Sequence, residues 1–213
     1  MSLPSISQGS HVGILGGSFD PPHLGHYLIA RQVLELIGVE AIWLLPYYNT
    51  ASFDKVFKKE LSPPSMRLEM AGLLEEEAIK VSDFEILYNK SSITIVTLEM
   101  LKKRYPEHTF LWIMGSDKLK DFQKYDRWEE LVNRHNLIIF PREHMLWDLE
   151  KRVKEAFRVD VIPENVVVLN NRDLVLTNIS STLTRKRVAG GLSIRHLVMA
   201  KVEEYIQKNG LYK

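Results

Sequence analysis

The 213-residue sequence contains no cysteine, which excludes disulfide bonds, thiolate metal sites and a cysteine nucleophile. It has no apolar run long enough to span a bilayer, and its first ten residues lack the apolar core of a signal peptide. Charge of either sign is not in excess, because the formal net charge is +1. This balance gives no support for bulk binding to nucleic acid or to a membrane surface. We therefore expect a cytoplasmic protein with neither kind of partner.

The hydrophobic content of 45% is sufficient for one sizeable core. We expect residues 1–10, which are polar and rich in serine, to form a flexible leader outside the fold. Residues 11–213 are then predicted to form a single domain, because they contain no internal repeat and no low-complexity segment.

Short apolar runs alternate with segments of helical spacing along the whole chain. The expected strands are Val12–Leu15, Ala41–Leu45, Ile79–Ser82, Phe110–Met114, Leu137–Phe140 and Val166–Leu169. The expected helices are Leu24–Ile37, Ser65–Glu76, Thr94–Arg104, Trp128–Asn133, Leu146–Phe157, Ser180–Val188 and Ile194–Lys208. This order predicts an α/β fold, a Rossmann-like, doubly wound and mainly parallel sheet with helices on both faces. Ligands of such sheets bind outside the carboxyl ends of the strands, where Gly16, Pro46 and Gly115 are expected to converge.

The most informative segment runs from Gly16 to His26 and reads Gly-Gly-Ser-Phe-Asp-Pro-Pro-His-Leu-Gly-His. Two glycines after a buried strand permit a sharp turn, and free amides at the following helix start can hold phosphate. His23 and His26 are three residues apart and share one helix face, with Gly25 leaving room for a nucleotide. The same residues are also compatible with an ordinary turn whose histidines cap the helix.

A second polar segment, Ile179 to Arg185, reads Ile-Ser-Ser-Thr-Leu-Thr-Arg. Ser180 or Ser181 can cap a helix, and Arg185 lies four residues beyond Ser181 on the same face. Together they form either a cradle for a polyphosphate or simply a well-capped surface helix.

The two segments, in this order, resemble the HxGH nucleotidyltransferases, specifically the bacterial nicotinate-nucleotide adenylyltransferases. The resemblance implies that His23, His26 and Arg185 act as catalytic residues that stabilise charge on the phosphates of ATP. It further implies an ATP site made of Gly16, Gly17, Ser18, Phe19, Gly25, Ile179, Ser180, Ser181 and Thr182.

The middle of the chain adds weaker matches to this family. They imply a mononucleotide site made of Thr94, Gly115, Asp117, Tyr125 and Lys55. Asp117 is equally compatible with a helix cap, and Trp128 is the alternative to Tyr125 as the ring that stacks on the pyridine. The sequence departs from the family at Ile93, where tyrosine is usual, and at Thr184, where an aliphatic residue is frequent. It also lacks the PPHK-like motif that usually follows the second strand. Lys55, or alternatively Lys58, is expected to supply the cation of that motif.

The resemblance implies adenylyl transfer from ATP to nicotinate mononucleotide in NAD biosynthesis, with Mg²⁺ held mainly by ATP phosphates and water because no carboxylate cluster is visible. Alternative acceptors are nicotinamide mononucleotide and phosphopantetheine. A nucleotide sensor without catalysis is another alternative. An aminoacyl-tRNA synthetase core is disfavoured, because no KMSKS-like lysine loop and no RNA-binding domain are visible. The sequence leaves a homo-oligomer possible.

Overall fold

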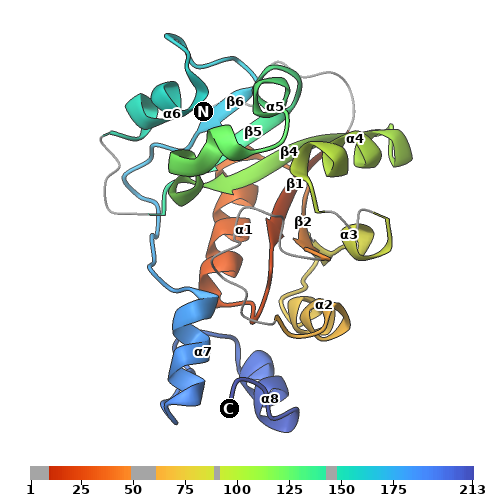
Figure 1. The fold of residues 1–213 in the computed structure, drawn as a ribbon, viewed down its shortest axis with the longest axis vertical. Helices are drawn as coiled ribbons and strands as arrows, with labels where there is room; N and C mark the ends of the chain where they lie inside the picture. The colour runs from red at the N-terminus through yellow and green to blue at the C-terminus, as the bar shows by residue number, and fades with distance from the viewer. Residues whose placement is uncertain (1–9, 49–60, 89–91, 143–147) are drawn as a thin grey trace.

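The structure, a computed structural model, describes residues 10–48, 61–88, 92–142 and 148–213. Its strands are β1 (Ser10–Gly17), β2 (Ala41–Pro46), β3 (Ile79–Val81), β4 (His108–Gly115), β5 (Asn136–Phe140) and β6 (Val166–Val168). They form one six-stranded sheet in the order β3-β2-β1-β4-β5-β6, and every neighbouring pair is parallel (Figure 1). The predicted Rossmann-like α/β fold is therefore confirmed.

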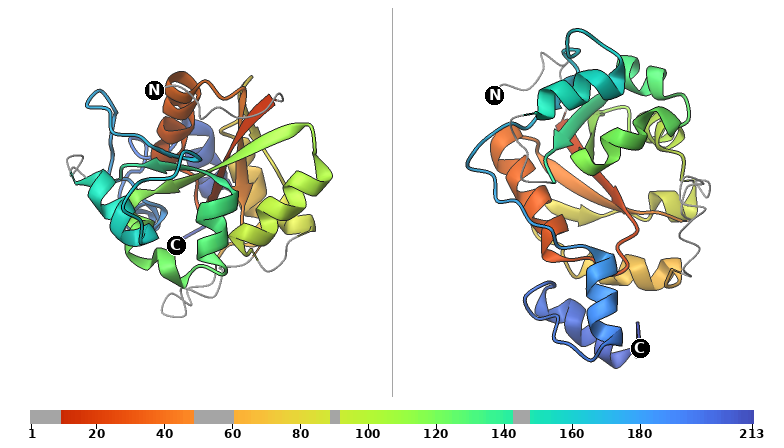
Figure 2. Two further views of the ribbon diagram at one scale, coloured as in Figure 1. Left: turned by 90° about the horizontal axis from the view of Figure 1, so that it is seen from above. Right: turned by 60° about the vertical axis from the view of Figure 1, so that its left-hand side comes forward.

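The helices of the described residues are α1 (Leu24–Ile37), α2 (Pro64–Gly72), α3 (Phe84–Leu87), α4 (Thr94–Arg104), the 3₁₀ segment η2 (Ser116–Lys124), α5 (Trp128–Arg134), α6 (Leu149–Phe157), α7 (Ser181–Ala189) and α8 (Ala200–Lys208). Figures 1 and 2 show α7 and α8 together at one end of the molecule, beyond α1 and α2. None of these helices is both long enough and apolar enough to cross a membrane.

The sheet separates two apolar clusters, because successive side chains of a strand point to opposite faces. In β4, Leu111 and Ile113 pack with α1, α2 and α8 in one cluster. Phe110 and Trp112 of the same strand pack with α4, η2, α5 and α6 in the other. Helices therefore cover both faces, as predicted, and the C-terminal helix shares its core with the first helix.

Several predicted boundaries are wrong. The last helix begins at Ala200 and not at Ile194, because Ile194, Leu197 and Val198 are buried in an irregular segment whose Leu197 carbonyl accepts the Leu24 amide at 2.8 Å. The helix expected over 65–76 ends at Gly72. The helices α3 and η2 were not predicted, and β1 already includes Ser10 of the expected leader. Residues 1–9 lie outside the described residues, so the rest of that leader stays a prediction.

The carboxyl ends of the central strands lie next to one another. Gly17 at the end of β1 is in register with Pro46 of β2, and Gly115 at the end of β4 is in register with Phe140 of β5. The convergence expected at this edge is confirmed, and the functional side chains follow these four strands directly.

Candidate active site

The two polar motifs, more than 150 residues apart in the sequence, meet at the carboxyl edge of the sheet. The Ser181 hydroxyl donates to the Pro21 carbonyl at 2.8 Å, and Arg185 Nη1 donates to the Asp20 carbonyl at 2.6 Å. Arg185 Nη2 also donates to Thr182 Oγ1 at 3.3 Å. The guanidinium is therefore held beside the segment that carries the two histidines.

The rings of His23 and His26 lie against each other in a tilted arrangement at the start of α1. Their ring centroids are 3.7 Å apart, and the ring of the buried, positive-φ Phe19 lies 4.7 Å from that of His26. The His23 backbone amide donates to His26 Nδ1 at 3.1 Å. Because Nδ1 accepts this bond, a neutral His26 carries its proton on Nε2, which leaves a fixed N–H donor for an anion.

Both imidazoles are neutral near pH 7. Burial, followed by the positive charge of Arg142, lowers the pKa of His23 to about 3. Burial lowers the pKa of His26 well below its usual value, with contributions from His23 and Arg142. The neutral rings can donate hydrogen bonds, and a bound polyanion would stabilise their protonated forms.

The low pKa of His23 predicts acid lability. The unfolded chain takes up a proton near pH 6.5, whereas the folded protein resists it until about pH 3, so stability is present above pH 6.5 and is lost as the pH falls through this window. Between pH 7 and pH 5, His23 alone is expected to lower the free energy of unfolding by about 2 kcal/mol. Urea titrations of wild type and His23→Gln at both pH values measure this loss. Equal losses in the two proteins would contradict the assignment.

Arg142 is a site residue that the sequence analysis missed. It follows β5 directly, its amide donates to Ser116 Oγ at 3.0 Å, and its Nη2 donates to the Ile179 carbonyl at 3.2 Å. Its charge acts on both histidines. A basic residue two positions after a buried strand, at the edge where ligands bind, was the available signal.

Glycines of the first motif make room for neighbouring side chains. A Cβ on Gly16 would lie 2.6 Å from the Trp112 ring, and a Cβ on Gly25 would lie 2.9 Å from the His23 ring. Glycine at these positions is thus required by packing of the protein itself. Contact of Gly16, Gly17 and Gly25 with a nucleotide stays a prediction.

The second motif forms the start of α7. The Ser180 hydroxyl accepts the Leu183 amide at 3.1 Å, which confirms Ser180 as the helix cap. Thr184, the departure from the family pattern, is fully buried, and its hydroxyl donates to the Ser180 carbonyl at 3.0 Å. The extra hydroxyl is therefore satisfied inside the helix and does not disturb the site.

Two of the residues predicted to hold the mononucleotide, Tyr125 and Asp117, lie near Tyr47, which the sequence analysis did not single out. Burial, together with the nearby Tyr125, Glu85 and Asp117, raises the pKa of the Tyr47 hydroxyl. The Tyr125 ring stacks on Phe122 with centroids 5.4 Å apart, and burial and Asp117 raise its pKa to about 12. Both hydroxyls thus stay protonated and able to donate a hydrogen bond.

Glu85 supports the same region from α3. It is fully buried, accepts a hydrogen bond from Thr97 Oγ1 at 2.6 Å, and has a pKa that burial raises. Thr97 lies in the first turn of α4, whose N-terminus carries Thr94. The buried carboxyl therefore fixes the start of the helix predicted to face the pyridine.

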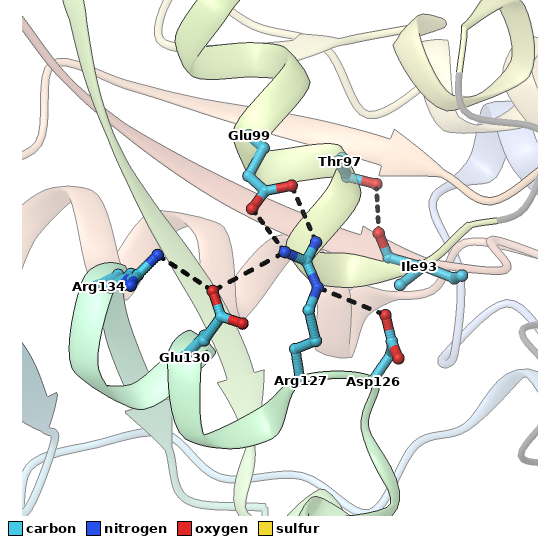
Figure 3. Close-up of polar contacts among 7 residues, drawn as sticks. All are labelled: Ile93, Thr97, Glu99, Asp126, Arg127, Glu130 and Arg134. Carbon is cyan, nitrogen blue, oxygen red and sulfur yellow. Dashed lines mark hydrogen bonds and ion pairs between the residues drawn. The ribbon is translucent and has the colours of Figure 1, made fainter.

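A group of ion pairs on the surface connects α4 with residues 126 and 127, which directly follow Tyr125 (Figure 3). Arg127 Nη1 and Nη2 each donate to Glu99 at 2.9 Å, and Arg127 Nε lies 3.7 Å from Asp126. Glu130 lies between Arg127 and Arg134. The bidentate geometry orients this segment, although exposed pairs contribute little to stability.

The remaining predicted residues have three different outcomes. Trp128 is partly buried and packs edge-to-face on Phe122 with ring centroids 6.3 Å apart, and Tyr125 packs against the same cluster, so the choice between the two rings stays a prediction. Thr94 begins α4 as expected. Lys55 and Lys58 lie outside the described residues, and the missing cation of the PPHK-like motif stays a prediction.

Within the described ranges, no group of three His, Asp or Glu side chains is placed to hold a metal ion. The carboxylate of Asp20, three residues before His23 in the sequence, accepts hydrogen bonds from the Tyr212 hydroxyl and the Ser62 amide. These residues fit a magnesium ion bound through phosphate oxygens and water, and they do not form a protein cage.

Comparisons with known proteins agree with this geometry. The family model described as cytidylyltransferase-like matches residues 14–187. A protein of Exiguobacterium sibiricum named a probable nicotinate-nucleotide adenylyltransferase is 33% identical over 94% of this chain and 98% of its own length. A protein of the same name from Flavobacterium johnsoniae is 32% identical over 95% of this chain and 98% of its own.

A solved structure supports the fold. The nicotinic acid mononucleotide adenylyltransferase of Plasmodium falciparum, complexed with NaAD, superposes with a TM-score of 0.76 at 24% identity, over 95% of this chain and 97% of that one. The same enzyme complexed with APC gives a TM-score of 0.75. The family match and the full-length relatives show that this chain belongs to the cytidylyltransferase-like family and, within it, to the nicotinate-nucleotide adenylyltransferases.

Proposed function

We propose that this protein transfers the adenylyl group of ATP to nicotinate mononucleotide, forming nicotinate adenine dinucleotide and pyrophosphate. The observation that carries the proposal is the contact between the two motifs, Ser181 to Pro21 and Arg185 to Asp20. This contact places a guanidinium and a helix N-terminus beside a pair of neutral imidazoles, a combination suited to a triphosphate.

The reaction is an in-line displacement. A phosphate oxygen of the mononucleotide forms a bond to the α-phosphorus of ATP, and the bond from that phosphorus to the β-phosphate oxygen breaks. The leaving pyrophosphate takes the electron pair. Such a transfer depends on positioning and charge stabilisation, so no covalent intermediate with the enzyme is required.

Each group at the carboxyl edge has a role in this displacement. The N–H of His26 and the ring of His23 donate to the α-phosphate as its charge is redistributed. Arg185 and the α7 start, including the Ser181 and Thr182 hydroxyls, hold the β- and γ-phosphates. Arg142, beside the imidazoles, contributes a further positive charge.

Mg²⁺, when bound, neutralises part of the triphosphate charge. The protein side chains then need only to fix the geometry, which is consistent with the sparse carboxylates of the described site. The backbone of Gly17 to Phe19 is proposed to contact the nucleotide, and Tyr125, Asp117 and Thr94 are proposed to seat the mononucleotide.

Nicotinate mononucleotide is expected to be the preferred acceptor by at least about tenfold in kcat/KM over nicotinamide mononucleotide. The first turn of α4 contains no acidic residue, and the amides of a helix N-terminus carry a partial positive charge that complements an anion. Hydrogen bonds from amides to a carboxylate are roughly twice as strong as those to a neutral amide. Initial rates of pyrophosphate release with Mg-ATP measure the preference.

Three other outcomes of this comparison decide between the alternatives. Faster turnover of nicotinamide mononucleotide would reverse the assigned preference and keep the reaction class. Turnover of phosphopantetheine alone would replace the pyridine acceptor. Binding of ATP without pyrophosphate release with any acceptor would support a nucleotide sensor and overturn the enzymatic assignment.

A further inference from the structure

The Asp20 carboxylate, in the middle of the first motif, faces the protein interior. Asp20 is 1% exposed, its Oδ1 accepts the Tyr212 hydroxyl at 2.6 Å, and its Oδ2 accepts the Ser62 amide at 3.3 Å. Its backbone carbonyl accepts Arg185 Nη1 at 2.6 Å. Asp20 is thus the point at which the histidine segment, the guanidinium of α7 and the end of the chain are joined.

A buried arginine holds this segment from the other side. Arg67 of α2 is 1% exposed and donates to the carbonyls of Ser62, Ser18 and Tyr48 at 2.9, 2.9 and 3.1 Å. Asp20 and Tyr212 counter the lowering of the Arg67 pKa that burial causes. Because Ser62 bonds to both Arg67 and Asp20, the buried positive and negative charges belong to one network.

Tyr212 brings the C-terminus into this network. Leu211 and Tyr212 pack against the apolar cluster of α1, α2 and α8. Burial and the Asp20 carboxylate raise the pKa of the Tyr212 hydroxyl, which keeps it protonated and able to donate. Figure 1 shows the chain end beside α7 and α8, on the side of the molecule where α2 also lies.

We propose that Tyr212 is a positioning residue for adenylyl transfer: its hydroxyl fixes the Asp20 carboxylate, and through it the backbone that carries His23 and the carbonyl that orients Arg185. Tyr212 itself touches no reacting group. The C-terminal segment is therefore part of the catalytic scaffold, and a change there alters turnover while leaving the pyridine site intact. This inference rests on the proposed transfer reaction.

The test compares two tyrosine-to-phenylalanine variants of the full chain. Tyr212→Phe removes only the hydroxyl that reaches Asp20. Tyr205→Phe is the matched control, because its hydroxyl, also in the C-terminal segment, donates at 2.7 Å to Glu69 away from the motif. We expect Tyr212→Phe to lower kcat about tenfold with an unchanged KM for nicotinate mononucleotide, and Tyr205→Phe to keep the wild-type kcat.

A double-mutant cycle separates positioning from general destabilisation. If Tyr212 acts through the Arg185 guanidinium and the histidine segment, Arg185→Ala combined with Tyr212→Phe is expected to be no more than about twofold slower than Arg185→Ala alone. Full additivity of the two losses, a wild-type kcat in Tyr212→Phe, or an equal loss in Tyr205→Phe would overturn the proposal.

A second measurement does not depend on turnover. Amide hydrogen exchange over residues 18–26 is expected to be about tenfold faster in Tyr212→Phe than in Tyr205→Phe, because the segment loses its anchor. Unchanged exchange there would overturn the anchoring role even if the wild-type protein released no pyrophosphate. Absence of pyrophosphate release by the wild type would instead count against the proposed function alone.

Discussion

Replacement of His26 by alanine is expected to lower kcat on the order of 10²-fold or more, with a much smaller change in the KM for nicotinate mononucleotide. The reason is the fixed tautomer: Nδ1 accepts the His23 amide at 3.1 Å, so the Nε2 proton is held ready for an anion. A donor that is already oriented requires no reorganisation when charge shifts onto the leaving phosphates. Single-turnover assays with saturating Mg-ATP measure the chemical step directly.

The matched control for this prediction is His196→Ala, which removes an exposed histidine beyond α7. It is expected to keep wild-type turnover. Loss of the His26 ring also removes the acceptor for the His23 amide, so the urea midpoint of each variant separates a folding defect from a catalytic one. A stably folded His26→Ala protein with full turnover would remove His26 from the mechanism.

The parallel sheet places the first motif at its carboxyl edge. Residues that follow the carboxyl ends of adjacent strands share one edge, whatever their distance in the sequence. Gly17 and Gly115 therefore mark the site from the pattern alone. By contrast, the contacts of Arg185 with Asp20 and of Ser181 with Pro21 depend on where the irregular segment after β6 returns, and no local pattern specifies that path.

The sequence analysis did not identify Arg142 and Tyr47 as site residues. Each has only a weak local signal, because a basic or aromatic residue shortly after a strand is common. Both residues are recognised only by their neighbours. The charge of Arg142 acts on two imidazoles, and Tyr47 lies near Tyr125, Asp117 and Glu85. Such proximity between separate loops appears only once the sheet order is known.

The predicted bounds of the last helix are wrong, and the 3₁₀ helix was not predicted, for a similar reason. The apolar residues from 194 to 199 follow helical spacing, but they fill a gap beside α1 with an irregular segment, so tertiary packing overrides the pattern. The segment Ser116–Lys124 forms a 3₁₀ helix in which Leu119 and Phe122 are buried. Its spacing of three matches a 3₁₀ turn, a periodicity that a search for α-helices misses.

Replacement of Arg67 by methionine is expected to have the largest effect on stability, lowering the free energy of unfolding by on the order of 3–5 kcal/mol. Methionine retains apolar volume but donates nothing, so the carbonyls of Ser18, Tyr48 and Ser62 lose their common donor. The buried Asp20 carboxylate also loses its neighbouring positive charge. Urea titrations with an unchanged m-value measure the loss as a lower midpoint.

Arg31→Met is the appropriate comparison, because Arg31 also makes several side-chain bonds, here to the carboxylates of Glu35 and Glu76, but its side chain is 40% exposed. An exposed ion pair contributes little to stability, and the two arginines differ in burial more than in the number of bonds that they make. If Arg67→Met lowered the free energy of unfolding no more than Arg31→Met does, the buried bonds from Arg67 to the three carbonyls would not be a main source of stability. Arg67→Lys is expected to recover only part of the loss, since one ammonium group cannot reproduce the planar fork that reaches three carbonyls.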